Sequence, residues 1–109
     1  MPAQLEVSGL IRAVEAAGGF AAVLRKGERE TGTILVVLTE KGAPARLFER
    51  IPDPEAGRQW RCTLHQDAEN PLDFNQYLER RGHRDPDLWI VELDIADGER
   101  FIGSLDKMG

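Results

Sequence analysis

The sequence predicts an α+β fold in which an antiparallel sheet of about five strands is packed by two helices, in the order α-β-β-β-β-α-β. Three observations support this class. The chain has 109 residues, which is close to the commonest domain length and leaves no room for a second core. Four consecutive apolar segments are separated only by short turns, as is typical of an antiparallel meander. Apolar residues at helical spacing occur once before and once after this run. We therefore expect one domain over residues 1–109.

Helical spacing defines two predicted helices. The first covers about residues 5–17, and the glycine pair at 18–19 follows it where a residue tolerant of positive φ is needed. The second begins at the N-cap candidate Asn70, continues with Pro71 at its first position and ends near Gly82. The apolar residues that define them are Val7, Leu10, Ile11 and Val14 in the first, and Phe74, Tyr77 and Leu78 in the second.

Five apolar segments are predicted strands: residues 20–26, 33–39, 45–51, 59–65 and 88–95. Turns rich in glycine, proline or aspartate separate them, and the turn at 27–32 is predicted to form a hairpin between the first two strands. The second strand is apolar on both faces, so both faces need cover. Trp60 and Trp89 each fall on the apolar face of a strand and are predicted core residues.

Composition and charge restrict the kinds of partner. The chain has 41% hydrophobic and 30% charged residues, as expected for a folded globular protein. Its 19 acidic residues outnumber 14 lysines and arginines, and the net charge of -5 disfavours nucleic acid and anionic membranes as partners. A cluster of Arg80, Arg81 and Arg84 leaves open whether an acidic ligand binds locally, and a solvated helix end is the alternative.

The compartment is predicted from what the chain lacks. Cys62 is the single cysteine and cannot form an internal disulfide, which fits a reducing environment. No segment approaches the roughly 18 to 20 apolar residues needed to span a membrane. The first residues lack the basic start and apolar core of a signal peptide. We therefore expect a cytoplasmic protein.

Four segments carry a resemblance to a known family. They are residues 5–12 (LEVSGLIR), 18–21 (GGFA), 25–28 (RKGE) and 85–92 (DPDLWIVE). In this order, along nearly the whole chain, they resemble an uncharacterised bacterial family, domain of unknown function 1491. The family more often carries aspartate at the position of Glu28, a change that keeps the charge and alters the turn chemistry. The resemblance implies the family's fold, and because the family has no established activity it implies no catalytic residue.

Two short motifs suggest chemistry but have structural alternatives. Residues 27–33 have the glycine spacing of a phosphate-binding loop, but the expected lysine is absent and Glu28 and Glu30 would repel phosphate, so a turn is favoured. Cys62 and His65 suggest a nucleophile and its base. Residues three apart on a regular strand point to opposite faces, so these two cannot pair without a bulge. Cys62 is therefore interpreted as a small buried apolar residue.

Asp87, Glu92 and Asp94 form the strongest enzymatic hint. Glu92 and Asp94 share one face of the predicted last strand, and Asp87 precedes it, so the three carboxylates could hold a hard cation in a metal-dependent hydrolase. Such an enzyme usually places a lysine where this chain has Asp94. The structural alternative is cross-strand pairing of these acids with arginines: Arg25, Arg46 or Arg50.

The leading hypothesis is a non-enzymatic accessory or protein-interaction domain, with the metal-dependent hydrolase as the alternative. Neither His65 nor His83 lies in a zinc-binding pattern, and we expect no metal, no cofactor and no catalytic residue. If both helices pack on one face of the sheet, the other face exposes several aliphatic side chains, which a homodimer or another protein partner would cover. One helix on each face is the competing arrangement and needs no partner.

Overall fold

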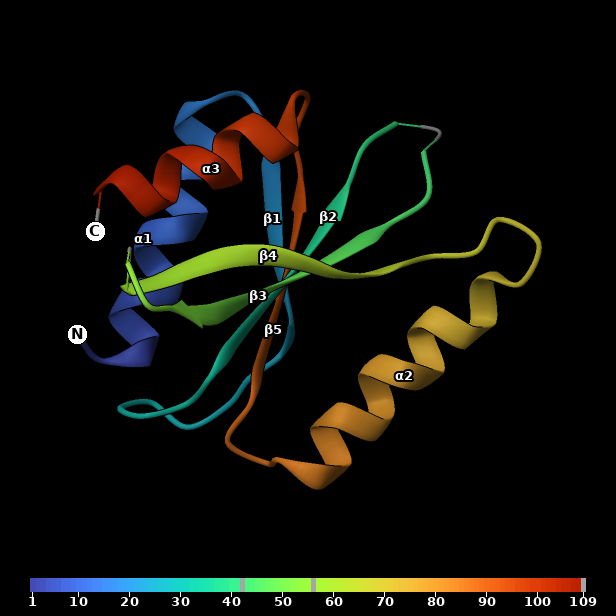
Figure 1. Ribbon diagram of the computed structural model, residues 1–109, viewed down its shortest axis with the longest axis horizontal. Coiled ribbons are helices and arrows are strands. Elements are labelled where there is room, and N and C mark those ends of the chain that lie inside the picture. The colour runs from blue at the N-terminus through green and yellow to red at the C-terminus, as the bar shows by residue number, and fades with distance from the viewer. Residues whose placement is uncertain (42, 56, 109) are drawn as a thin grey trace.

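The computed structural model describes residues 1–41, 43–55 and 57–108. Three helices and five strands follow one another along these residues (Figure 1). In chain order they are α1 (Ala3–Ala16), β1 (Phe20–Arg25), β2 (Ile34–Thr39), β3 (Arg46–Asp53), β4 (Gly57–His65), α2 (Pro71–Arg84), β5 (Trp89–Asp94) and α3 (Gly98–Met108). No helix in this part of the chain is long and apolar enough to cross a membrane. The α+β class, the five strands and the two predicted helices are confirmed.

The sheet is mixed, and its strand order is β1-β5-β2-β3-β4. β2, β3 and β4 form an antiparallel meander, as predicted. β5 lies between β1 and β2, antiparallel to β1 and parallel to β2, so the predicted hairpin at residues 27–32 is wrong. The physical reason is that β2 and β5 are apolar on both faces, which favours fully covered central positions. α2 provides the long crossover that a parallel pair requires.

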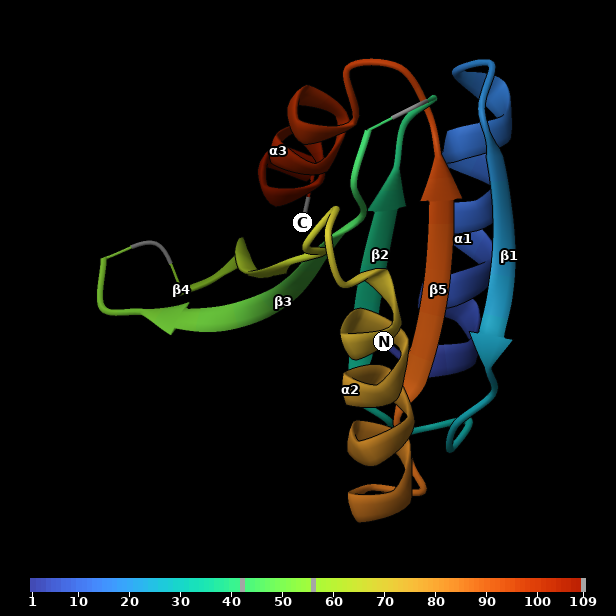
Figure 2. The ribbon, with the colours of Figure 1, turned by 90° about the vertical axis from the view of Figure 1, so that its right-hand side faces the viewer.

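Helices cover both faces of the sheet (Figure 2). α1 and α3 pack on one face and share one cluster of buried apolar side chains. α2 packs on the other face against a second cluster. The count of only two helices is therefore wrong, and the two predicted helices, α1 and α2, take the competing arrangement with one on each face. The helix that the sequence analysis misses is α3, whose Phe101, Ile102 and Leu105 recur at helical spacing and contact the core. β1 and β4 form the two edges of the sheet.

Local sequence signals fix the ends of the first two helices. α1 ends at the glycine pair, where Gly18 has a φ of 90° and the amide of Gly19 donates to the carbonyl oxygen of Val14 at 2.9 Å. α2 begins with a proline after Asn70, as predicted. The Asn70 side chain does not cap the backbone and donates to the Asp73 carboxylate at 2.8 Å.

The loop that connects β1 to β2 has to cross the end where β5 begins, because β5 lies between the two strands it joins. The amide of Glu28 donates to the carbonyl oxygen of Asp87 at 2.9 Å, and Nε1 of Trp89 donates to the carbonyl oxygen of Glu28 at 2.7 Å. A Cβ atom on Gly27 or Gly32 would lie only 2.1 or 2.3 Å from the Asp87 oxygen. Glycine at both positions therefore permits this close crossing.

The same loop also holds the N-terminus of α1. The amides of Ala3 and Gln4 donate to the carbonyl oxygens of Glu30 and Arg29, at 3.1 and 2.8 Å. Nε of Arg29 adds a hydrogen bond of 2.7 Å to the side-chain oxygen of Gln4. The first amides of a helix have no partner within the helix, so the loop supplies the acceptors that a capping residue would otherwise supply.

The two tryptophans occupy different environments. Trp89 is 3% exposed and lies in the core, as predicted. Trp60 lies on the edge strand β4 and is partly buried, with its ring packed against the core and the Arg50 guanidinium 5.0 Å from the ring centroid. The prediction of a core position is therefore confirmed for Trp89, while Trp60 lies at the rim.

We expect Trp89→Ala to lower the free energy of unfolding by about 3 to 5 kcal/mol, because it empties a fully buried site and removes the hydrogen bond to Glu28. Urea denaturation measures the change, and Trp60→Ala provides the matched control. Its cost should be clearly smaller, since its side chain is only partly buried. Equal costs for the two variants would contradict the described packing.

Candidate functional site

The edge strand β1 exposes an apolar surface. Three of the seven large hydrophobic residues exposed in the described chain belong to this one strand: Phe20 at 73%, Leu24 at 51% and Val23 at 42%. With Ala21 and Ala22 they form an uncharged stretch of five residues, which we call the β1 surface. Sheet edges of soluble proteins are usually protected by charged side chains, short strands or bulges. Here a register shift between Val23 and Arg25 is the only such irregularity in β1.

The opposite edge of the sheet has a different character. β4 exposes Arg58, Arg61, Thr63 and His65, so charged or polar side chains alternate along it. Charges at an edge discourage the addition of another strand. Of the two edge strands, only β1 exposes large apolar side chains.

Neither face of β1 is fully covered by the helices. Phe20 and Ala22 pair with Asp94 and Glu92 of β5, so they lie on the α2 face of the sheet. α2 packs on β2, β3 and β5, and its cluster of buried apolar side chains includes no residue of β1. On the other face α1 lies against β1, yet Val23 stays 42% exposed. The β1 surface is thus accessible from the edge and from the α2 face.

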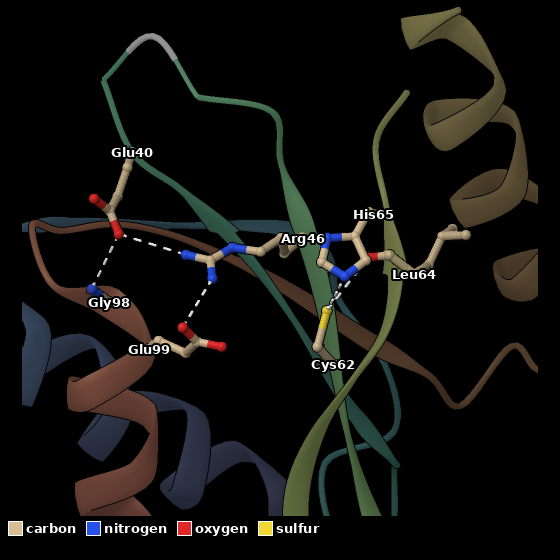
Figure 3. A network of polar contacts seen from close by, with 7 residues as sticks. All are labelled: Glu40, Arg46, Cys62, Leu64, His65, Gly98 and Glu99. Atoms are coloured by element: carbon tan, nitrogen blue, oxygen red, sulfur yellow. Dashed lines mark hydrogen bonds and ion pairs between the residues drawn. The ribbon is translucent and has the colours of Figure 1, made fainter. Parts of the chain in front are cut away.

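Cys62 and His65 lie together, contrary to the prediction that they point to opposite faces. The register shifts between the pairs Leu47–Leu64 and Phe48–Cys62, so Thr63 is an extra residue in β4 and forms the bulge that pairing requires. Sγ of Cys62 lies 3.6 Å from Nε2 of His65 (Figure 3). The sequence does not reveal this bulge, because its cause is the pairing with β3.

The Cys62–His65 pair is suited to a reactive thiol more than to a hydrolase. The imidazole nitrogen lies where it can accept the thiol proton as the thiol attacks an electrophile. Cys62 is partly buried, and its thiol also lies 3.7 Å from the carbonyl oxygen of Leu64. In the described chain no carboxylate hydrogen-bonds to the His65 ring. The pair therefore lacks the third group that orients the base in catalytic triads.

Arg46 lies beside this pair and organises a structural network (Figure 3). Its guanidinium is 3.5 Å from Glu40 and 3.3 Å from Glu99, and the amide of Gly98 donates to the same Glu40 oxygen at 3.3 Å. The network joins the ends of β2 and β3 to the start of α3. Because two carboxylates neutralise its charge, Arg46 is not available to activate the thiol.

The acids of the hydrolase alternative do not converge. Asp87 precedes β5, whereas Asp94 is the last residue of that strand, so the two stand at its opposite ends. Glu92 lies between them, facing Ala22 of β1 on one side and Val37 of β2 on the other. Among residues 1–41, 43–55 and 57–108, no three His, Cys, Asp or Glu side chains are close enough to hold a metal ion.

The arginines proposed as partners of those acids have other roles. Arg46 pairs with Glu40 and Glu99, and Arg50 forms an ion pair with Glu6 of α1. The Arg25 guanidinium lies against Gly82 of α2, where its Nε is buried without a hydrogen-bond partner in the described chain. The predicted cross-strand pairing with Glu92 and Asp94 is therefore wrong.

One member of the arginine cluster is used within the fold. Arg81 donates to Glu49 of β3 at 3.0 Å and to the hydroxyl of Tyr77 at 3.1 Å. This ion pair fastens α2 to the sheet, whereas Arg80 and Arg84 are exposed. Burial raises the pKa of Glu49, but hydrogen bonds from Arg81 and Thr63 outweigh it and lower the pKa below 4.5. The three arginines are therefore not equivalent, because the charge of Arg81 is already paired within the fold.

The glycine-rich loop binds its own carboxylate where a phosphate would sit. Oε2 of Glu28 accepts hydrogen bonds from the amides of Glu30 and Thr31, both at 2.7 Å. These amides are the donors that a phosphate-binding loop offers to its ligand. Chiefly through the Thr31 and Glu30 amides, the pKa of the Glu28 carboxyl is lowered from its ordinary value of 4.5. The loop is therefore a structural turn whose amides are hydrogen-bonded to its own Glu28 carboxylate.

Fold and surface together define a class: a small α+β domain with an apolar edge strand and with no metal-binding cluster among the described residues. The chain belongs to DUF1491, a family described as a protein of unknown function, whose model matches residues 1–103. The predicted resemblance to that family is confirmed. No curated protein matches the chain.

Solved structures of similar proteins share this fold. A crystal structure of a DUF1491 family protein from Caulobacter crescentus CB15 is 33% identical, covers 86% of this chain and 87% of that one, and has a TM-score of 0.73. An NMR structure of a DUF1491 family protein from the same organism is 36% identical over 88% and 86%, with a TM-score of 0.71. The solution structure of Atu0922 from A. tumefaciens is 33% identical over 84% and 83%, with a TM-score of 0.68.

The Cys62–His65 contact predicts the reactivity of the thiol. We expect His65→Gln to slow alkylation of Cys62 by iodoacetamide several-fold at neutral pH, because the variant removes the proton acceptor 3.6 Å from Sγ. The rate is followed by intact-mass spectrometry. His83→Gln is the control. It changes the second histidine of the chain, which lies on α2, and should leave the rate unchanged. An unchanged rate in His65→Gln would show that the contact has no chemical effect.

The lowered pKa of Glu28 predicts how stability depends on pH. A carboxylate whose pKa is lower in the folded state stabilises the fold above its unfolded pKa, and the contribution is lost as pH falls through the folded pKa. We therefore expect Glu28→Gln to be less stable than the wild type at neutral pH, and the difference to shrink below about pH 4.5. Glu28→Asp keeps the charge and should retain most of the stability. Thermal melts across this range would refute the assignment if the difference were independent of pH.

Proposed function

We propose that this protein is a non-enzymatic interaction domain that binds a protein partner through the edge strand β1. The observation that carries the proposal is the β1 surface, five uncharged residues with Phe20 73% exposed at the edge of a sheet. Contiguous exposed apolar patches on small soluble proteins are typical of binding surfaces.

Strand addition is the binding mode that suits this surface. An edge strand offers unpaired amide and carbonyl groups along its outer side, and a partner strand satisfies them with main-chain hydrogen bonds. The exposed side chains of Phe20, Val23 and Leu24 would supply apolar contacts, so affinity comes from the backbone and selectivity from the side chains. The charged edge at β4 has no comparable apolar stretch.

Two further observations support binding over catalysis. Asp87, Glu92 and Asp94 are spread along β5, and the described residues contain no metal-binding cluster, so no feature favours the metal-dependent hydrolase. The net charge of -5 disfavours a polyanionic ligand and is compatible with a protein partner.

The proposal is tested by changing the β1 surface without touching the core. A tagged copy of the protein in its native cells retains its binding partners, including untagged copies of the chain itself. We expect the double variant Phe20→Ser, Leu24→Ser to retain about tenfold less of these proteins than the wild type. Leu72→Ser, which changes another exposed leucine at 67% on α2, is the matched control and should retain them. Thermal melts verify that both variants fold. Equal retention by the β1 variant would refute the proposed surface.

A further inference from the structure

We propose that Cys62 is a site of reversible modification by thiol–disulfide exchange, in which a low-molecular-weight disulfide transfers one of its two halves to Sγ while His65 carries the proton. This inference is independent of the proposed function, because it uses β4 and not the β1 surface. It assigns a chemical step to the Cys62–His65 pair and names the class of reactant.

A β-bulge brings the two side chains together. β4 pairs with β3 in one register from Gly57 to Cys62 and in another at Leu64 and His65, and Thr63 is the extra residue between them. On a regular strand His65 would lie on the face opposite Cys62, whereas the extra residue returns it to the same face. Bulges are frequent next to active sites, where they redirect a side chain. Strand pairing therefore specifies this contact.

The contact provides a nucleophile and a base. Nε2 of His65 lies 3.6 Å from Sγ of Cys62, so the imidazole can take the thiol proton as the sulfur attacks (Figure 3). The attack forms a bond between Sγ and one sulfur of the small disulfide and breaks the bond between the two sulfurs of that molecule. The leaving thiolate then takes the proton from His65. The Cys62 sulfur is oxidised, the leaving sulfur is reduced, and the products are a mixed disulfide and a free thiol.

The composition of the chain points to an external reactant. Cys62 is the single cysteine of the sequence, so any disulfide that it forms joins it to another molecule. A disulfide between two copies would bring two β4 strands together, and the exposed charges of Arg58 and Arg61 discourage that approach. Cys62 is also only partly exposed, which favours a small reactant over a cysteine on another protein. A low-molecular-weight disulfide meets these conditions.

The single cysteine also determines how the modification is removed. Where a second cysteine lies nearby, it can displace the small thiol and form an internal disulfide. This chain has no second cysteine, so the mixed disulfide persists until an external thiol attacks it. The same exchange then runs in reverse and returns Cys62 to the free thiol. The modified fraction should therefore follow the ratio of small disulfide to small thiol.

Intact-mass spectrometry tests the modification. The folded full chain is incubated at neutral pH with an excess of glutathione disulfide as the probe. We expect the wild type to gain the mass of one glutathionyl group per chain and to lose it again in dithiothreitol, while Cys62→Ser gains none. Absence of the adduct on the folded wild type, or a disulfide-linked dimer as the main product, would overturn the proposal.

The pH dependence of the rate tests the role of His65. An ordinary thiol is mostly protonated at neutral pH and ionised above about pH 9. We therefore expect His65→Gln to react several-fold more slowly than the wild type at neutral pH and at the same rate at the higher pH. His83→Gln, on α2, is the matched control and should follow the wild type at every pH. Equal rates of His65→Gln and wild type at neutral pH would contradict proton transfer to His65. A reduction by the same factor at every pH would indicate a purely structural effect and would also contradict it.

Unfolding tests whether the bulge is responsible. In concentrated urea the pairing of β3 with β4 is lost, so the wild type and His65→Gln should then react with glutathione disulfide at the same rate. A difference that persists in the unfolded chain would contradict the assignment of the effect to the folded Cys62–His65 contact.

Discussion

The position of β5 between β1 and β2 is the constraint on which the rest of the structure depends. It forces the loop after β1 to cross the start of β5, where Gly27 and Gly32 allow contact with the backbone of Asp87. That loop receives the Trp89 indole and caps α1. Two segments of the family resemblance, residues 25–28 and 85–92, therefore meet at one structural junction. The same arrangement places β1 at the edge of the sheet. The backbone of this apolar strand therefore pairs with a neighbouring strand on one side only.

Local structure is well predicted from the sequence, and strand pairing is not. Apolar periodicity, the glycine pair after α1 and the proline of α2 specify elements through neighbouring residues, so their positions are confirmed. The insertion of β5 depends on contacts between strands more than 50 residues apart in sequence, such as that of Val36 with Val91. Periodicity within one segment contains no information about its partner. In α3, Phe101, Ile102 and Leu105 have the spacing of an amphipathic helix. Because the helix is short, these few residues give only a weak pattern in the sequence.

Contacts that depend on how strands pair likewise cannot be predicted from a single sequence. The Cys62–His65 contact exists because β4 has one extra residue at Thr63, and alternation on a regular strand predicts the opposite. From the sequence, an exposed apolar surface is expected on one sheet face if both predicted helices pack on the other. In the structure helices cover both faces. Three of the large apolar side chains that remain exposed belong to the edge strand β1, because a helix can cover a face but does not satisfy an edge.

The central claim is that β1 is the edge through which this domain binds a protein partner. Hydrogen exchange followed by mass spectrometry tests it most directly, by comparing the tagged protein alone with the same protein bound to the proteins it retains from its native cells. The account predicts slower amide exchange on binding in β1, residues Phe20–Arg25, and unchanged exchange in the other edge strand, β4. Slower exchange confined to segments other than β1 would contradict it.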